Sequence, residues 1–137
     1  MSYSGSCLCG AVAYEFDGEP RVAVHCHCSQ CRKVTGSTLA TWVLLPLEEF
    51  RWLKGEQQLK RFASSDRGQR LFCGTCGSTL GSLTERRPNL MHLAAGTLEQ
   101  APTFRVAFHT YVASMAPWHE ITDALPRFDS EPSARPR

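Results

Sequence analysis

The sequence of 137 residues lacks the features of a membrane-bound, exported or nucleic-acid-binding chain. It has no apolar run close to the roughly 20 residues that cross a bilayer, and its first ten residues, MSYSGSCLCG, hold no apolar stretch of the signal-peptide kind. It also lacks an excess of charge of one sign, because 15 Lys and Arg stand against 13 Asp and Glu, for a net charge of +2. We therefore expect a soluble cytoplasmic protein that binds neither membranes nor nucleic acid.

Long helical periods are missing too, and short alternating or apolar runs separated by glycine, proline and small polar residues take their place. This pattern predicts a mainly β domain of short antiparallel strands. We expect strands over residues 11–16, 21–25, 39–45, 59–63, 69–72, 78–83, 90–94 and 106–112, and one helical turn over 47–50. The length fits a single domain over residues 1–128, and the polar, proline-containing residues 129–137 are expected to form a flexible tail.

The chain is rich in cysteine, with seven residues in three groups: Cys7 and Cys9, then Cys26, Cys28 and Cys31, then Cys73 and Cys76. Cysteines two or three residues apart can direct their sulfurs to one metal ion, and zinc is the usual occupant of such sites. Disulfides are disfavoured by the odd number of cysteines and by the expected reducing compartment. A redox-active pair at residues 73–76 is disfavoured as well, because turn and strand residues follow it where a helix would be required.

The grouping predicts two zinc ions per chain with different roles. Two pairs make one closed site of four sulfurs, and closed zinc sites are structural. The middle group supplies three ligands and leaves a fourth position open, as catalytic zinc sites do. We name these sets the four-cysteine cluster (Cys7, Cys9, Cys73 and Cys76) and the three-cysteine cluster (Cys26, Cys28 and Cys31).

The fourth ligand of the three-cysteine cluster is not fixed by the sequence. In an extended segment, His25 and His27 point away from the cysteines beside them. A closed structural site would need a distant histidine, and the choices are His92, His109 and His119.

An open zinc site with three thiolates is a weak Lewis acid for water but a good site for a further thiolate, so it favours sulfur chemistry over hydrolysis. A nucleobase deaminase is excluded, because the glutamate of its H-x-E element and the proline before its C-x-x-C are missing.

Ordered motifs cover nearly the whole chain. They are GSCLCGAV at 5–12, CHCSQCRK at 26–33 with TGS at 35–37, RLFCGTCGS at 70–78, AGTL at 95–98, His109, PW at 117–118 and LPRF at 125–128. With these motifs the chain resembles the glutathione-dependent formaldehyde-activating enzyme family, also called the centromere protein V type. The resemblance implies a β-tent fold, a structural zinc on the four-cysteine cluster and a second zinc on the three-cysteine cluster that is catalytic in carbon–sulfur lyase activity.

The resemblance also implies a small thiol as partner, with glutathione as the expected one. Glutathione carries two carboxylates, and Arg32, Lys33 and Arg70, which lie close to the metal ligands in sequence, are candidates to pair with them. Trp118 is a candidate for a wall of the pocket.

The predicted function is thus a zinc-dependent carbon–sulfur lyase that acts on a glutathione-like adduct, such as S-hydroxymethylglutathione formed from formaldehyde. The alternative is a non-catalytic zinc module with a protein-interaction or chaperone-like role. Such a module should fill both zinc sites with four protein ligands.

Overall fold

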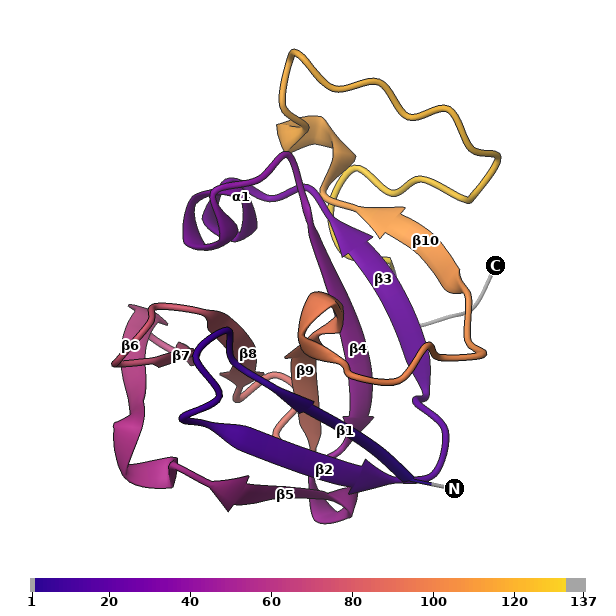
Figure 1. Cartoon of the computed structure of the whole chain (residues 1–137). Helices are drawn as coiled ribbons and strands as arrows, with labels where there is room; N and C mark the ends of the chain where they lie inside the picture. The colour runs from indigo at the N-terminus through magenta and orange to yellow at the C-terminus, as the bar shows by residue number, and fades with distance from the viewer. Residues whose placement is uncertain (1, 133–137) are drawn as a thin grey trace.

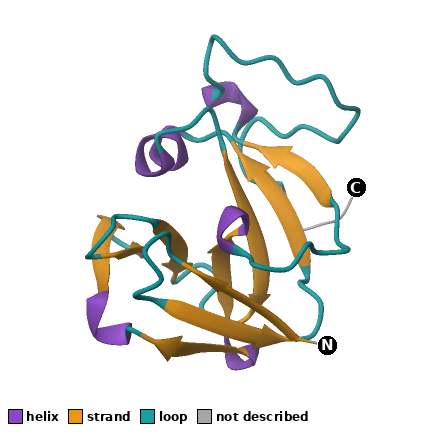
Figure 2. Cartoon of the chain, viewed as in Figure 1, coloured by secondary structure: helices purple, strands orange, loops and turns teal. Residues whose placement is uncertain are grey.

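The computed structural model describes residues 2–132, which form two β-sheets with little helix (Figures 1 and 2). The small sheet has the strand order β1-β2-β5, and the large sheet has the order β10-β3-β4-β9-β8-β7-β6. The strands are β1 Ser2–Ser6, β2 Ala13–Asp17, β3 Val22–Cys26, β4 Ala40–Pro46, β5 Phe50–Lys54, β6 Leu59–Ser65, β7 Gly68–Cys73, β8 Thr79–Thr84, β9 Leu90–Ala94 and β10 Val106–Thr110. Strand β10 pairs with β3 in parallel, and the other pairs are antiparallel.

Helix is limited to short pieces: α1 Ser29–Thr35 and the 3-10 turns η1 Leu47–Glu49, η2 Glu56–Gln58, η3 Ala95–Thr97 and η4 Val112–Ser114. Within residues 2–132, no helix has the length and apolar character needed to cross a membrane.

The predicted mainly β domain of short antiparallel strands is confirmed, and each predicted strand overlaps an observed one. The predicted helical turn is η1. The sequence analysis did not predict β1, β5 and α1. Strand β1 reads SYSGS, with Tyr3 as its only large apolar side chain, and α1 buries only Cys31. Neither segment therefore carries a hydrophobic period that a sequence reading could detect.

The main core lies between the two sheets. Tyr14 and Phe16 of β2 are fully buried in one apolar cluster with Val43 and Leu45 of β4. Because successive side chains of a strand point to opposite faces, Trp42 of β4 lies on the other face of the large sheet. The small sheet thus covers one face of the large sheet and leaves the other face to a second cluster.

That second apolar cluster contains Trp42 and Leu44 together with Cys26 and Cys31. Helix α1 lies just beyond the end of β3 (Figure 1). It begins at Cys28, whose Sγ accepts the backbone N–H of Cys31 at 3.2 Å. The cysteines therefore determine where the helix begins, and Cys26 and Cys31 also pack in this apolar cluster.

The segment after β10 returns to the domain. The backbone N–H groups of Tyr111 and Ala113 donate to the carbonyls of Ser130 and Asp129 at 3.3 and 3.4 Å. These bonds, and the ion pairs of Glu131 described below, hold residues 129–131 against the segment after β10 and the turn between β8 and β9. The predicted flexible tail thus begins with residues that have fixed partners, and its remaining residues 133–137 lie outside the described ones.

Candidate metal centres

The four-cysteine cluster joins two segments that lie far apart in the sequence. Its sulfur atoms all lie within 4.8 Å of one another. The Sγ atom of Cys9 is 3.7 Å from that of Cys7 and 3.9 Å from that of Cys73. A disulfide has a sulfur–sulfur distance of about 2.05 Å, and all seven cysteines of this chain are free. The four sulfurs are therefore arranged to surround one metal ion.

Backbone N–H groups turn toward the sulfurs of this cluster. The N–H groups of Thr75 and Cys76 donate to Cys73 Sγ at 3.3 and 3.4 Å, and the bond from Cys76 is the main cause that lowers the pKa of Cys73. Gly77 closes the turn at a φ of 80°, a conformation that favours glycine. The turn at residues 7–10 also has a glycine with a positive φ of 78°, and the backbone N–H of Val12 donates to Cys7 Sγ at 3.3 Å. Backbone donors at Cys7 and Cys73 thus favour a negatively charged sulfur in each segment of the cluster.

The three-cysteine cluster lies where β3 passes into α1. Its sulfurs also lie within 4.8 Å of one another. The indole N–H of Trp42 donates to Cys31 Sγ at 3.4 Å, and the guanidinium of Arg70 donates to the same sulfur at 3.7 Å. Both donors favour a negatively charged sulfur.

Three thiols at this spacing compete for negative charge. Hydrogen bonds from Cys26, and then from Cys31, hold the pKa of Cys28 far below its usual value. The hydrogen bond to Cys28 raises the pKa of Cys26. One sulfur therefore ionises at the expense of another, and a divalent cation among the three would remove this conflict. The donor set suits a soft, tetrahedral metal ion.

The histidines of the motif lie on the other side of β3. The Nδ1 atom of His25 is 2.8 Å from the hydroxyl of Thr41, and His27 Nε2 is 2.8 Å from His109 Nδ1. His109 Nε2 lies 3.0 Å from the carboxylate of Asp123. His25 and His27 thus point away from the cysteines, as predicted. In the part of the chain that the structure describes, no fourth His, Cys, Asp or Glu joins the three sulfurs.

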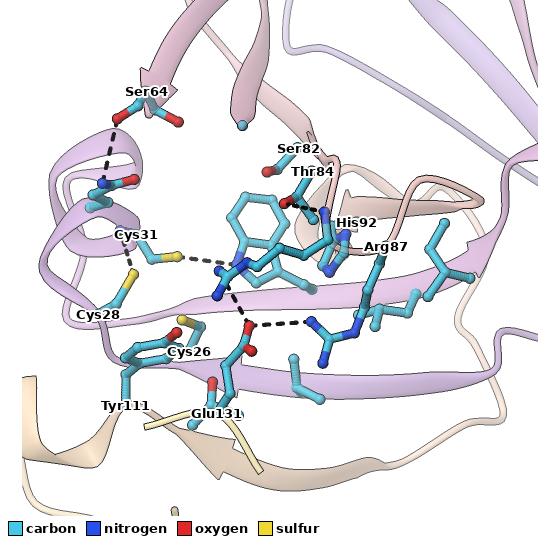
Figure 3. Close-up of a pocket in the computed structure, with 18 of the residues that line it drawn as sticks. Cys26, Cys28, Cys31, Ser64, Ser82, Thr84, Arg87, His92, Tyr111 and Glu131 are labelled. Carbon is cyan, nitrogen blue, oxygen red and sulfur yellow. Dashed lines mark hydrogen bonds and ion pairs between the residues drawn. The ribbon is translucent and has the colours of Figure 1, made fainter. Parts of the chain in front are cut away.

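The three sulfurs face a cavity of about 690 Å³ (Figure 3). It lies on the face of the large sheet that the small sheet leaves uncovered, and α1 and the segment after β10 complete its lining. Three arginines and one carboxylate contribute to that lining: Arg70, Arg86, Arg87 and Glu131. Small-molecule sites typically have volumes of about 300–1,000 Å³, so the cavity is large enough for a ligand of peptide size.

One row of paired residues crosses the wall of the cavity. The strand register places Arg70 beside Ser82, Ser82 beside His92 and His92 beside Leu44, and all four line the cavity. Arg70 is only 9% exposed. Burial, and then the charges of Arg87 and Arg70, lower the pKa of His92 to about 4. His92 is therefore neutral near pH 7, and the arginines supply the positive charge of the wall.

The structure brings only part of the predicted substrate contacts to this cavity. Arg70 lines it next to the three-cysteine cluster. Arg32, Lys33 and Trp118 instead line a separate surface hollow with residues 36–38, and Trp118 is 72% exposed. Helical geometry explains this placement, because the two cysteines at the start of α1 are three residues apart and share one face, while the basic residues that follow turn away from it.

Arg86, Arg87 and Glu131 line the cavity but were not predicted from the sequence. A signal for the arginines was available in β8, where Ser82 and Thr84 stand on either side of Leu83 and so place small polar side chains on one face. The two arginines follow directly in the chain. No local pattern marks Glu131, whose role depends on the return of the chain after β10.

Comparisons with known proteins agree with the motifs. The model of the family described as glutathione-dependent formaldehyde-activating enzyme matches residues 2–114. A Halomonas elongata protein provisionally named a glutathione-dependent formaldehyde-activating enzyme is 28% identical over 130 residues, which cover 88% of this chain and 82% of that protein. A Schizosaccharomyces pombe protein named an uncharacterized lyase is 31% identical over 84 residues, which cover 57% of this chain and 55% of that protein.

A solved structure is similar to this chain in fold. The crystal structure of a Rhodobacter sphaeroides protein matches this chain with a TM-score of 0.62 and 26% sequence identity, over 73% of this chain and 91% of that one. The family match includes both cysteine clusters, and it confirms the resemblance that the motifs carry. The chain therefore belongs to the glutathione-dependent formaldehyde-activating enzyme family.

Proposed function

We propose that this protein is a zinc-dependent carbon–sulfur lyase that acts on an adduct of glutathione or a similar small thiol. The family and the names of two relatives support a glutathione-related lyase. One observation carries the proposal: three sulfurs face a cavity, and within residues 2–132 they have no fourth protein ligand. The substrate that we infer is S-hydroxymethylglutathione, the adduct of glutathione with formaldehyde.

Zinc is the metal that we propose for both clusters. The four-cysteine cluster would hold a structural ion, because it offers a complete set of four sulfurs. The three-cysteine cluster would hold the second ion through Cys26, Cys28 and Cys31. When bound there, zinc would supply the positive charge that keeps the sulfur of the substrate ionised at neutral pH.

Arg70 adds a fixed positive charge at the same end of the cavity. Its guanidinium lies 3.7 Å from Cys31 Sγ and donates to Gln30 Oε1 at 3.2 Å. It also lies over the ring of Trp42, 5.9 Å from the ring centroid. These contacts hold the cation in place before a ligand arrives. A thiolate entering the cavity would therefore meet a preorganised positive charge.

The proposed reaction forms or breaks one carbon–sulfur bond and transfers one proton. In adduct formation, the thiolate sulfur attacks the carbonyl carbon of formaldehyde, and the electron pair of the carbon–oxygen π bond moves to oxygen. The oxygen then takes up one proton, which balances the proton that the thiol has lost. The reverse reaction breaks the carbon–sulfur bond and returns the thiolate and formaldehyde, so neither direction requires an oxidant or a reductant.

Exchange spectroscopy tests this function. The zinc-loaded protein should speed the exchange between free formaldehyde and S-hydroxymethylglutathione, followed by magnetisation-transfer NMR. The Cys28→Ser variant is the matched control and should leave the uncatalysed rate unchanged. In cobalt-substituted protein, glutathione should strengthen the sulfur-to-metal charge-transfer band, and this variant should give no such response.

The possible results distinguish the proposed lyase from two alternatives. A spectral response without faster exchange would keep the thiol site but reject formaldehyde as the electrophile. A cobalt spectrum that no small thiol changes would contradict the proposal and favour the non-catalytic zinc module.

A further inference from the structure

Glu131 pairs with two neighbouring arginines inside the cavity that the three-cysteine cluster faces. Its Oε1 atom lies 3.2 Å from Nη1 of Arg87 and 3.4 Å from Nη2 of Arg86. All three residues line the cavity, and Figure 3 shows the carboxylate of Glu131 directed into it, next to Arg87. Two guanidinium groups thus converge on one carboxylate oxygen, which is the arrangement of a carboxylate-binding site.

The charges around this contact do not balance. The cavity lining contains the guanidinium groups of Arg70, Arg86 and Arg87 but only one carboxylate, that of Glu131. Among these side chains the difference is two positive charges, and a divalent ion held by the three thiolates would add one net negative charge and leave an excess of one. Arg70 is nearly buried, and its guanidinium donates to Cys31 and Gln30 and lies over the ring of Trp42, none of which brings a carboxylate. A cavity with this excess attracts anions.

The two kinds of polar group belong to different parts of the cavity. The sulfurs come from the end of β3 and the start of α1, whereas Arg86 and Arg87 follow β8, and Figure 3 draws the labelled cysteines to the left of Arg87 and His92. Polar side chains of Ser82 and Thr84 line the wall as well. A ligand that satisfies both parts needs a sulfur and, several bonds away, a carboxylate. A peptide thiol with a free carboxylate has this chemistry.

The geometry points to a carboxylate subsite formed by Arg86 and Arg87, in which Glu131 takes the place of the substrate carboxylate and is displaced when the substrate binds. The assignment of the ligand as a thiol rests on the proposed function. The assignment of the subsite rests on the converging arginines alone.

The ion pairs of Glu131 are suited to such an exchange. All three side chains are partly exposed to solvent, and exposed ion pairs are weak. A substrate that is also held at its sulfur can therefore compete with Glu131 at the arginines. Glu131 would lower the affinity for carboxylate ligands, and more so for ligands that lack the sulfur contact.

Calorimetric titration of the zinc-loaded protein tests the subsite without relying on catalysis. The probes are S-methylglutathione, whose blocked sulfur cannot ionise, and its dimethyl ester, which lacks both carboxylate charges. The intact protein should bind the free acid more tightly than the ester. The double variant Arg86→Gln, Arg87→Gln should weaken binding of the acid by roughly tenfold and leave binding of the ester unchanged.

Glu131→Gln should have the opposite effect. It removes the competing charge and keeps the size of the side chain, so the acid should bind up to about fivefold more tightly. A variant that fails to fold cannot gain affinity, so this result would also show that the substitutions report on the subsite and not on folding. Arg61→Gln is the matched control, because Arg61 is exposed and does not line the cavity.

The possible results test the carboxylate subsite separately from the proposed lyase function. Equal binding of acid and ester, or an unchanged affinity in the double arginine variant, would overturn the subsite even if formaldehyde exchange is accelerated. Acid-selective binding that depends on Arg86 and Arg87, without any acceleration, would support the subsite and reject the lyase. If neither the intact protein nor the Glu131→Gln variant binds either probe, the subsite is overturned.

Discussion

The two cysteine clusters use the same ligand atom but have different surroundings. The sulfurs of the four-cysteine cluster receive backbone N–H groups from tight turns and connect the end of β1 to the turn between β7 and β8. The sulfurs of the three-cysteine cluster lie between a strand end and a short helix, receive two side-chain donors besides the backbone N–H of Cys31, and face a cavity. The proposed division into a structural and a reactive site therefore rests on the groups that face the sulfurs as well as on the number of sulfurs.

The largest expected effect comes from breaking the four-cysteine cluster. Cys73 is fully buried, and the cluster links segments 64 residues apart. Cys73→Ser should destabilise the domain by on the order of 5 kcal/mol or more, because the binding energy of a structural zinc contributes to folding. Thermal unfolding followed by circular dichroism measures this effect. A variant that melts cooperatively within a few degrees of the intact protein would remove the structural role.

A smaller effect on stability, with a complete loss of activity, is expected from Cys28→Ser. Serine is a good residue for the start of a helix, so α1 should keep the N-terminal cap that Cys28 provides. The variant should lose the second metal ion and retain a cooperative transition. Metal analysis should fall from two zinc ions per chain to one. Equal destabilisation by the Cys28 and Cys73 substitutions would contradict the division of roles.

The parts of this comparison differ in how far the sequence predicts them. Both clusters could be proposed because their ligands lie two or three residues apart, and spacing of this kind is local. The strands with alternating apolar residues could be predicted for the same reason. Strand β1 could not, since its fit depends on Gly5, where a Cβ atom would clash with the hydroxyl of Tyr14. That contact exists only after the sheet has formed.

The lining of the cavity was even harder to predict from the sequence, because its residues come from distant parts of the chain. Arg32 and Lys33 are close to the cysteines in sequence, but the turn of α1 directs them to another surface. Arg87 and Glu131 are 44 residues apart and meet only because the chain returns after β10. Proximity in sequence therefore indicates which sulfurs within one turn form a cluster, but it does not indicate which side chains line the cavity.

The smallest effects are expected from single hydrogen bonds to the sulfurs, and they sharpen the comparison most. Trp42 is buried, and its indole N–H donates to Cys31 Sγ at 3.4 Å. Trp42→Phe removes this donor and keeps an aromatic ring, so the three-cysteine cluster should bind its metal about tenfold more weakly. The matched variant of the other cluster is Ser78→Ala, because the hydroxyl of Ser78 lies 3.2 Å from Cys76 Sγ.

Release of zinc to a coloured chelator should resolve both clusters in one experiment. The intact protein should release zinc in two phases, with the fast phase from the three-cysteine cluster, because its sulfurs face the cavity. Trp42→Phe should speed the fast phase only, whereas Ser78→Ala should speed the slow phase only. Thermal unfolding of both variants checks that the fold persists, with an expected loss of about 1 kcal/mol for each hydrogen bond. If either substitution changes both phases equally, the two clusters are not independent, and the comparison between a structural and a reactive site fails.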